Sequence, residues 1–112
     1  MCIFCKIIAG EIPSSKVYED ELVLAFRDIE PQAPEHVIII PKEHIPSANA
    51  ITSENSGVIA HIFEVIPKIA KDLNIDESGY RVVNNCGKDG GQTVEHIHFH
   101  LTGGRHFGWP AG

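Results

Sequence analysis

The sequence has few basic residues and no long apolar run. Nine Lys and Arg stand against fifteen Asp and Glu, so the net charge is −6 at neutral pH. Proteins that bind a nucleic-acid backbone carry basic patches, and because none is visible we expect no nucleic-acid partner. No apolar stretch approaches the roughly 20 residues that cross a bilayer. The first residues also lack the features of a secretory signal, so we expect a cytoplasmic protein with no membrane partner.

Cysteine is also scarce. The three cysteines are Cys2, Cys5 and Cys86, an odd number that does not suit a secreted disulfide framework. Cys2 and Cys5 form a C-x-x-C pair. A redox pair of this kind follows a strand, which is not expected before Cys2, and a zinc site needs two further ligands. Spacing alone therefore leaves three interpretations: a redox dithiol, half of a zinc site or two buried thiols.

The 112 residues, 43% of them hydrophobic, predict one domain spanning 1–112, without repeats. The apolar spacing predicts a short helix, five strands and one long helix capped by Thr52 or Ser53 and kinked at Pro67. Strand-to-strand links are mostly hairpins or long loops, which favours an antiparallel α+β sheet with the helices on one side. The expected helices are 3–8 and 58–73, and the expected strands are 16–19, 22–26, 36–40 (ended by Pro41), 79–83 and 94–101.

Histidine is abundant, with seven residues, and three of these alternate along the last expected strand. His96, His98 and His100 share one face of a strand, while Ile97, Phe99 and Leu101 share the other. A solvated face, a metal site and nucleophilic catalysis are the competing interpretations. Alternate residues lie about 6.6 Å apart, so at most two neighbouring histidines can share one ion.

Nucleophilic catalysis is favoured by the loop that precedes these histidines. Residues 84–91 are rich in glycine, which lets a backbone approach an anion, and Gln92 and Thr93 follow with polar groups. A neutral imidazole can attack phosphorus and be displaced by water, and flanking imidazoles can bind phosphoryl oxygens or move a proton. An ordinary hairpin loop would explain the glycines but not the histidines.

Residues 89–101 resemble the signature of the histidine triad family, and within it the branch of nucleoside phosphoramidases. Residues 26–36 and 103–110 also match, so the resemblance runs nearly end to end. It implies a five-stranded antiparallel sheet with one long and one short helix, paired into a homodimer. It further implies a purine nucleotide substrate, whose P–N bond is cleaved when His98 attacks phosphorus and forms a nucleotidyl-histidine. The chemistry would need no cofactor.

The resemblance also assigns roles to other residues. Asp28 would hold the ribose hydroxyls with Ile29 beside it, and His36 would be a fourth histidine that supports the catalytic pair His98 and His100. A carboxylate suits a ribose diol, although a loop-capping aspartate is the simpler interpretation of Asp28. The residues expected at the phosphate or leaving group are Asn85, Gly91, Gln92, Thr93 and His100. Those expected to line an apolar slot for the base, or else to be core, are Phe4, Ile8, Phe26 and Ile29.

Bacterial relatives that carry the cysteine pair bind zinc with two histidines. The resemblance thus implies a structural zinc held by Cys2, Cys5, His44 and His96. This assignment agrees with the spacing argument, because it removes His96 from phosphate binding. We interpret His61 as structural or exposed.

Two alternatives to the phosphoramidase remain open at this point. The same triad serves dinucleoside polyphosphate hydrolases in a neighbouring branch, and a nucleotide-binding interaction module with little catalysis is a candidate from another class. The tail around Trp109 differs from that of eukaryotic members, which leaves the leaving-group preference open.

Overall fold

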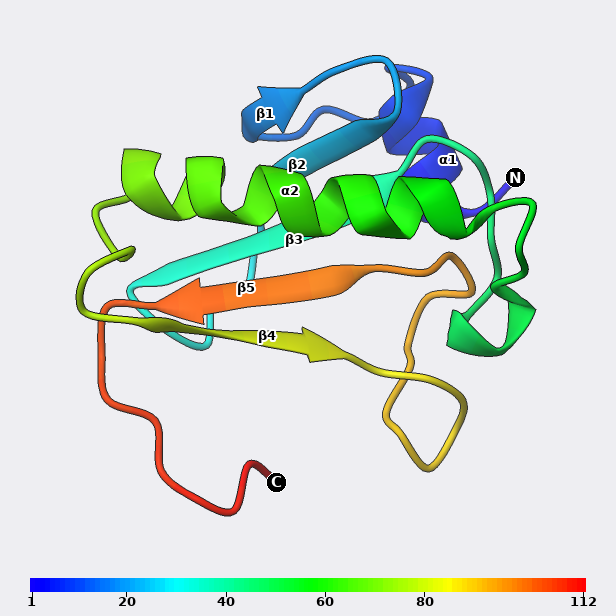
Figure 1. The fold of residues 1–112 in the computed structure, drawn as a ribbon. Coiled ribbons are helices and arrows are strands. Elements are labelled where there is room, and N and C mark those ends of the chain that lie inside the picture. Colours follow the sequence, from blue (N-terminus) through cyan, green and yellow to red (C-terminus); the bar gives the residue numbers. More distant parts are fainter.

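The computed structural model describes residues 1–112 as five strands, two α-helices and one 3-10 turn (Figure 1). The strands form one antiparallel sheet in the order β1-β2-β3-β5-β4. The predicted α+β class, with one long and one short helix, is confirmed. The elements are α1 (Ile3–Ile8), β1 (Lys16–Glu19), β2 (Val23–Arg27), β3 (Glu35–Pro41), η1 (Ala48–Ala50), α2 (Ser56–Asp72), β4 (Tyr80–Asn84) and β5 (Phe99–Gly103).

Strand β3 lies at the centre of the sheet, between β2 and β5. Its β-branched run suits a strand covered on both faces, and six of its seven residues are buried. The strand includes Pro41, where we predicted it to stop. Pro41 occupies the end of the strand, where a missing N–H is tolerated, and its carbonyl accepts a hydrogen bond from His96.

The two helices cover opposite faces of the sheet, so the prediction of both helices on one side is wrong. Helix α2 packs with Val37, Ile39 and Leu101 in the larger core. The alternate residues of the same strands face α1, which contributes Phe4 and Ile7 to a second core. Because β2 and β3 are apolar on both faces, each face needs a cover, and short α1 supplies the second one.

Helix α2 begins at Ser56 and has Asn55 as its N-cap residue, so the predicted cap at Thr52 or Ser53 is wrong. The Asn55 side chain accepts instead from the backbone N–H of Thr52. The helix continues through Pro67, which lies on its exposed side. Water can therefore reach the backbone carbonyl that a proline leaves without a partner. Neither helix combines the length and apolarity needed to cross a membrane.

Strand β5 begins at Phe99, five residues later than predicted, so His96 and His98 precede the strand. The backbone N–H of Ile97 donates to the carbonyl of Ile45, a residue outside the sheet, and not to a strand neighbour. The predicted alternation of faces nevertheless holds. Ile97 and Phe99 lie in the larger core, whereas His96 and His98 contact Phe4 on the other face.

Candidate active site and candidate metal centre

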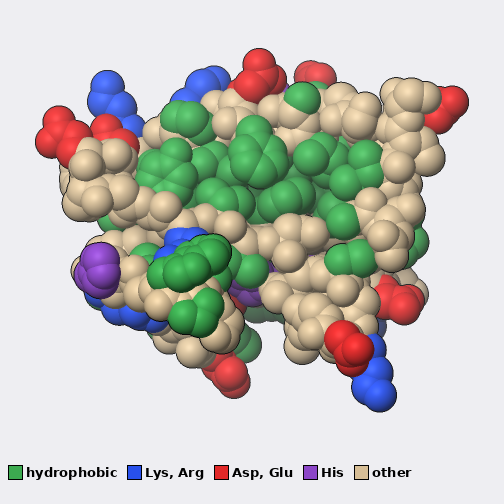
Figure 2. Space-filling view, turned by 60° about the horizontal axis from the view of Figure 1, so that its bottom comes forward, with side chains coloured by type: hydrophobic (Ala, Val, Ile, Leu, Met, Phe, Trp, Pro, Cys, Tyr) green, Lys and Arg blue, Asp and Glu red, His purple; other side chains and the backbone are tan.

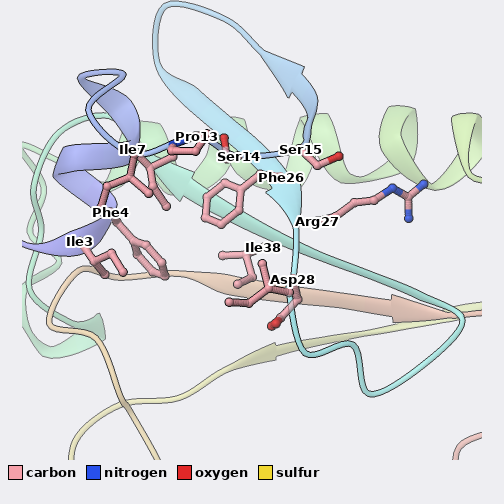
Figure 3. A pocket seen from close by; sticks show the side chains of 12 residues that line it. Ile3, Phe4, Ile7, Pro13, Ser14, Ser15, Phe26, Arg27, Asp28 and Ile38 are labelled. Atoms are coloured by element: carbon pink, nitrogen blue, oxygen red, sulfur yellow. The ribbon is translucent and has the colours of Figure 1, made fainter.

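An apolar cavity of about 310 Å³ lies between α1 and strands β2 and β3 (Figure 3). Of the four residues expected to form an apolar slot, Phe4, Phe26 and Ile29 line the cavity. Ile8 does not; its helix neighbour Ile7 takes that place, because Ile7 points into the sheet and is buried. Ile29 is 95% exposed, so it lies at the mouth of the cavity.

Asp28 lines the same cavity and directly follows the last residue of β2. One carboxylate oxygen accepts from the backbone N–H of Glu30 at 2.8 Å, which is the loop-capping role. The other oxygen lies 3.4 Å from Nε2 of His36. Asp28 therefore caps its loop and also presents a carboxylate to the cavity wall.

Ser14 was not singled out in the sequence, although it also lines the cavity. Its Oγ is buried and is the one buried side-chain oxygen or nitrogen without a hydrogen-bond partner. A serine between a proline and another serine carries no sequence signal for such a position.

His98 is 3% exposed and has a defined tautomer. Its Nδ1 lies 2.8 Å from the backbone carbonyl of His96, and a carbonyl only accepts, so Nδ1 carries the proton. Nε2 of neutral His98 is then left with a free lone pair. Asn84 donates its side-chain amide to the His98 carbonyl at 2.9 Å and so fixes the same peptide. Asn84 was missed in the sequence because its role depends on β4 lying beside this segment.

His36 and His100 form a hydrogen-bonded pair across β3 and β5. The backbone N–H of Gln32 donates to Nδ1 of His36 at 3.0 Å, so neutral His36 carries its proton on Nε2. That Nε2 lies 2.9 Å from Nδ1 of His100, which leaves Nε2 of His100 as the protonated nitrogen. Burial lowers the pKa of both imidazoles, which favours their neutral forms.

Residues 85–93 form a compact loop before the histidines. The side-chain amide of Asn85 donates to the carbonyl of Gly90, and that of Gln92 donates to the carbonyls of Pro46 and Val94. The Gln92 side-chain oxygen accepts from the N–H of Gly87. Both side chains thus hold the loop in shape, while Gly91 and Thr93 line a shallow polar hollow on it. Neither amide forms a hydrogen bond with His98 or His100.

Cys2, Cys5, His44 and His96 form a cluster that can hold a metal ion, with all donor atoms within 4.8 Å of one another. The sulfur-to-Nδ1 distances are 3.3–3.7 Å, and the two Nδ1 atoms are 3.2 Å apart. Nε2 of His96 donates to the carbonyl of Pro41 at 2.8 Å, so its Nδ1 lone pair faces the cluster. This second contact is typical of a metal-binding histidine, because it sets the tautomer.

Asp28, His36 and His100 are a second close group of polar side chains. The N–H of Gln32 occupies Nδ1 of His36, and His36 in turn occupies Nδ1 of His100. Because these nitrogens already take part in hydrogen bonds, we interpret this group as a hydrogen-bonded chain and not as a second metal site.

The chain is similar to known proteins both in sequence and in structure. The HIT domain model matches residues 9–107. A purine nucleoside phosphoramidase from Escherichia coli (strain K12) is 51% identical over 106 residues, which covers 95% of this chain and 89% of that protein. An uncharacterised HIT-like protein from Synechocystis is 48% identical over 98% of this chain and 96% of its own length.

Among solved structures, a HIT family hydrolase from Legionella pneumophila superposes with a TM-score of 0.97 at 50% identity, covering 100% of both chains. A histidine triad protein from Clostridium difficile gives a TM-score of 0.92 at 51% identity, covering 96% of this chain and 93% of that one. The matched family model, the relatives and the shared fold agree. This chain belongs to the HIT family.

Proposed function

We propose that this chain hydrolyses the P–N bond of purine nucleoside 5′-phosphoramidates. One observation carries the proposal: buried His98 donates from Nδ1 to the His96 carbonyl, which leaves Nε2 as a free nucleophile. The E. coli relative at 51% identity is a purine nucleoside phosphoramidase, which supports the same reaction. The apolar cavity beside His98 suits a flat purine base.

The substrate would lie along the residues described above. The base enters the cavity lined by Phe4 and Phe26, and Asp28 accepts hydrogen bonds from the ribose hydroxyls with Ile29 beside the sugar. A carboxylate repels phosphate, so Asp28 belongs at the sugar end. The groups proposed near the phosphate and leaving group are Asn85, Gly91, Gln92, Thr93 and His100.

The reaction has two displacements at phosphorus. Nε2 of His98 forms a bond to the α-phosphorus, the P–N bond of the substrate breaks, and the amine leaves with a proton drawn from solvent. Water then attacks the nucleotidyl-histidine and gives a proton to solvent, the bond between phosphorus and Nε2 breaks with its electron pair returning to Nε2, and nucleoside monophosphate is released. During both steps the Nε2 proton of His100 donates to a phosphoryl oxygen, and His36 keeps His100 in this tautomer.

We propose that the metal of the cluster is zinc. Zinc bonds of about 2.3 Å to sulfur and about 2.1 Å to nitrogen give a tetrahedron with S–N edges of about 3.6 Å and an N–N edge of about 3.4 Å. The observed separations of 3.3–3.7 Å and 3.2 Å are close to these edges. A bound zinc would hold α1, the segment after β3 and the segment before β5 together, and would be structural.

We further propose that the chain forms a homodimer through the sheet face beside α2. Figure 2 shows a broad apolar patch on the side of the molecule that carries α2 and β4. Phe63, which packs on Phe99, is 51% exposed, and Tyr80 is 37% exposed. Strand β4 is an edge strand with half-buried residues, which a second copy would cover.

The catalytic proposal is tested by trapping the intermediate. Mass spectrometry of rapidly quenched protein should place a nucleotidyl group on His98. His98→Asn should show no adduct and lose about 10⁴-fold or more in turnover while still binding nucleotide. Turnover that survives this substitution contradicts the mechanism. Parallel assays with a phosphoramidate and a dinucleoside polyphosphate distinguish the proposed reaction from that of the neighbouring branch.

The zinc proposal has a separate test. Metal analysis of protein expressed with ample zinc should find one zinc per chain, and the Cys2→Ser/Cys5→Ser variant should contain none. Purified protein without stoichiometric metal would rule the zinc proposal out.

A further inference from the structure

Phe4 lies in both of the sites described above. It occupies α1 between Cys2 and Cys5, and its ring lines the apolar cavity (Figure 3). The ring meets His96 edge-on at a centroid distance of 5.9 Å and His98 at 5.1 Å. Phe4 is 6% exposed, so its ring has little freedom to move unless α1 moves with it.

Helix α1 meets the metal cluster at its N-terminal end, in addition to packing on the sheet. The helix has six residues, too few to be stable alone, so tertiary contacts must hold it. Its N-cap is the sulfur of Cys2, which accepts from the N–H of Cys5 at 3.3 Å. Both sulfurs face Nδ1 of His44 and His96, on segments distant in sequence. An ion shared by these four side chains would connect the helical turn from Cys2 to Cys5, which contains Phe4, to the rest of the domain.

We propose that metal binding at the Cys2, Cys5, His44 and His96 cluster and nucleotide binding in the cavity are coupled, with Phe4 as the positioning residue. This inference rests on the proposed nucleotide site. The metal holds α1, α1 holds the Phe4 ring, and the ring is one wall of the base cavity. Nucleotide then meets a wall that is already in place and does not lose affinity to ordering it.

The sign and size of the effect follow from linkage. If metal strengthens nucleotide binding by some factor, nucleotide must strengthen metal binding by the same factor. One ligand commonly changes the affinity for another by a factor of about 5 to 150. Since a single side chain is shared here, we expect a factor near the lower end of this range, about tenfold.

The experiment measures both halves of this linkage on the full chain. AMP affinity is measured by calorimetry with zinc-loaded and zinc-free protein, and zinc affinity is measured by chelator competition with and without saturating AMP. We expect both affinities to rise by about tenfold, and by equal factors. The proposal would be overturned if AMP affinity were the same with and without zinc, or if zinc affinity were the same with and without AMP.

Two variants test the role of Phe4 itself. Phe4→Ala keeps all four metal ligands but removes the shared wall, so the coupling should fall to about twofold or less. Phe4→Leu keeps an apolar wall, should fold in any case, and should show intermediate coupling. Ile39→Val removes one methyl group from the core on the α2 face of β3 and should keep the wild-type coupling. This control distinguishes the role of Phe4 from a general loss of stability. Full coupling in both Phe4 variants would refute the role of Phe4.

A measurement without nucleotide separates this inference from the proposed function. In methyl NMR spectra, zinc removal should shift or broaden Ile7 and Ile38, which line the cavity, and leave Ile62 of α2 unchanged. Unmoved Ile7 and Ile38 signals would overturn the coupling even if turnover is normal. Loss of turnover with this response intact would count against the proposed reaction alone.

Discussion

Nε2 of His36 lies 2.9 Å from Nδ1 of His100, and this contact joins two histidines of neighbouring strands. The register pairs His36 with Thr102 and Ile38 with His100, so the two imidazoles are diagonal neighbours on one face of the sheet. The N–H of Gln32 determines which nitrogen of His36 carries the proton, and His36 determines it for His100. A backbone amide in a loop thereby controls the tautomer of a proposed catalytic residue.

His36→Ala should lower kcat by about 10- to 100-fold and change KM by less than about twofold. The substitution removes the donor to His100 and leaves the N–H of Gln32 without its acceptor. His36→Gln offers both an acceptor and a donor, so it should recover part of the rate. Steady-state kinetics with a phosphoramidate checks this. An unchanged kcat in His36→Ala would contradict the role given to His36.

The pair of His61 and Asp20 should make stability depend on pH. A hydrogen bond from His61 to Asp20 at 2.7 Å raises the pKa of His61. Partial burial opposes ionisation of Asp20, but hydrogen bonds, with that of His61 first, hold its pKa below the ordinary value. His61 therefore contributes stability that is complete below about pH 6.5 and is lost as pH rises through its raised pKa. Asp20 contributes stability that is lost as pH falls through its lowered pKa.

Thermal melts of wild type and His61→Asn test this dependence. The variant should melt below wild type at about pH 5.5, and the gap should close at about pH 9. Turnover at neutral pH should be unchanged, since His61 lies on α2 away from the cavity. A gap that is constant across this range would show that the ion pair does not stabilise the fold.

Ser14→Ala should not destabilise the protein. The Ser14 hydroxyl is buried without a partner, so replacing it by hydrogen removes an uncompensated polar group. We expect a gain of up to about 1 kcal/mol in the free energy of unfolding, measured by urea denaturation. Ser15→Ala, at an exposed neighbour, is the matched control and should have little effect. A loss in Ser14→Ala would mean that the hydroxyl has a partner in solution.

Gly90→Ala should disrupt the loop before the histidines. A Cβ at Gly90 would fall on the backbone carbonyl oxygen of Cys86, and backbone cannot give way as a flexible side chain does. We expect a loss of about 1–3 kcal/mol in stability together with lower turnover. Gly57→Ala is the control, because its Cβ meets nothing within 4 Å and alanine suits a helix better. Equal effects of the two substitutions would contradict the steric argument.

Phe63→Asp should dissociate the proposed dimer. The side chain is 51% exposed in the single chain and would be covered by the second copy. Burying an unpaired carboxylate there is unfavourable, so sedimentation velocity should show a monomer. Leu22→Asp changes an equally exposed residue, at 51%, in the turn between β1 and β2 and should leave the dimer intact. Wild-type protein that sediments as a monomer would rule the dimer out.

Several features follow from local sequence alone. The alternation of His96, His98 and His100 with Ile97 and Phe99 separates two faces, because side chains of extended backbone alternate whatever they pack against. The two faces remain separate even at residues 96–98, which precede β5 and are not part of the sheet. The short helix, the central apolar strand and the antiparallel α+β class were likewise predictable from apolar spacing and short links.

Other features depend on contacts between distant segments. The residue types that carry chemistry can be found along the chain: alternating histidines, a glycine-rich loop and a C-x-x-C pair. Three relationships can be found only in the folded molecule: α1 covers the face opposite α2, Gln32 and Asn84 hold His36 and His98, and Phe4 lies between the cavity and the cluster. Periodicity is set along the backbone, whereas these partners meet only after the sheet has brought residues tens of positions apart together.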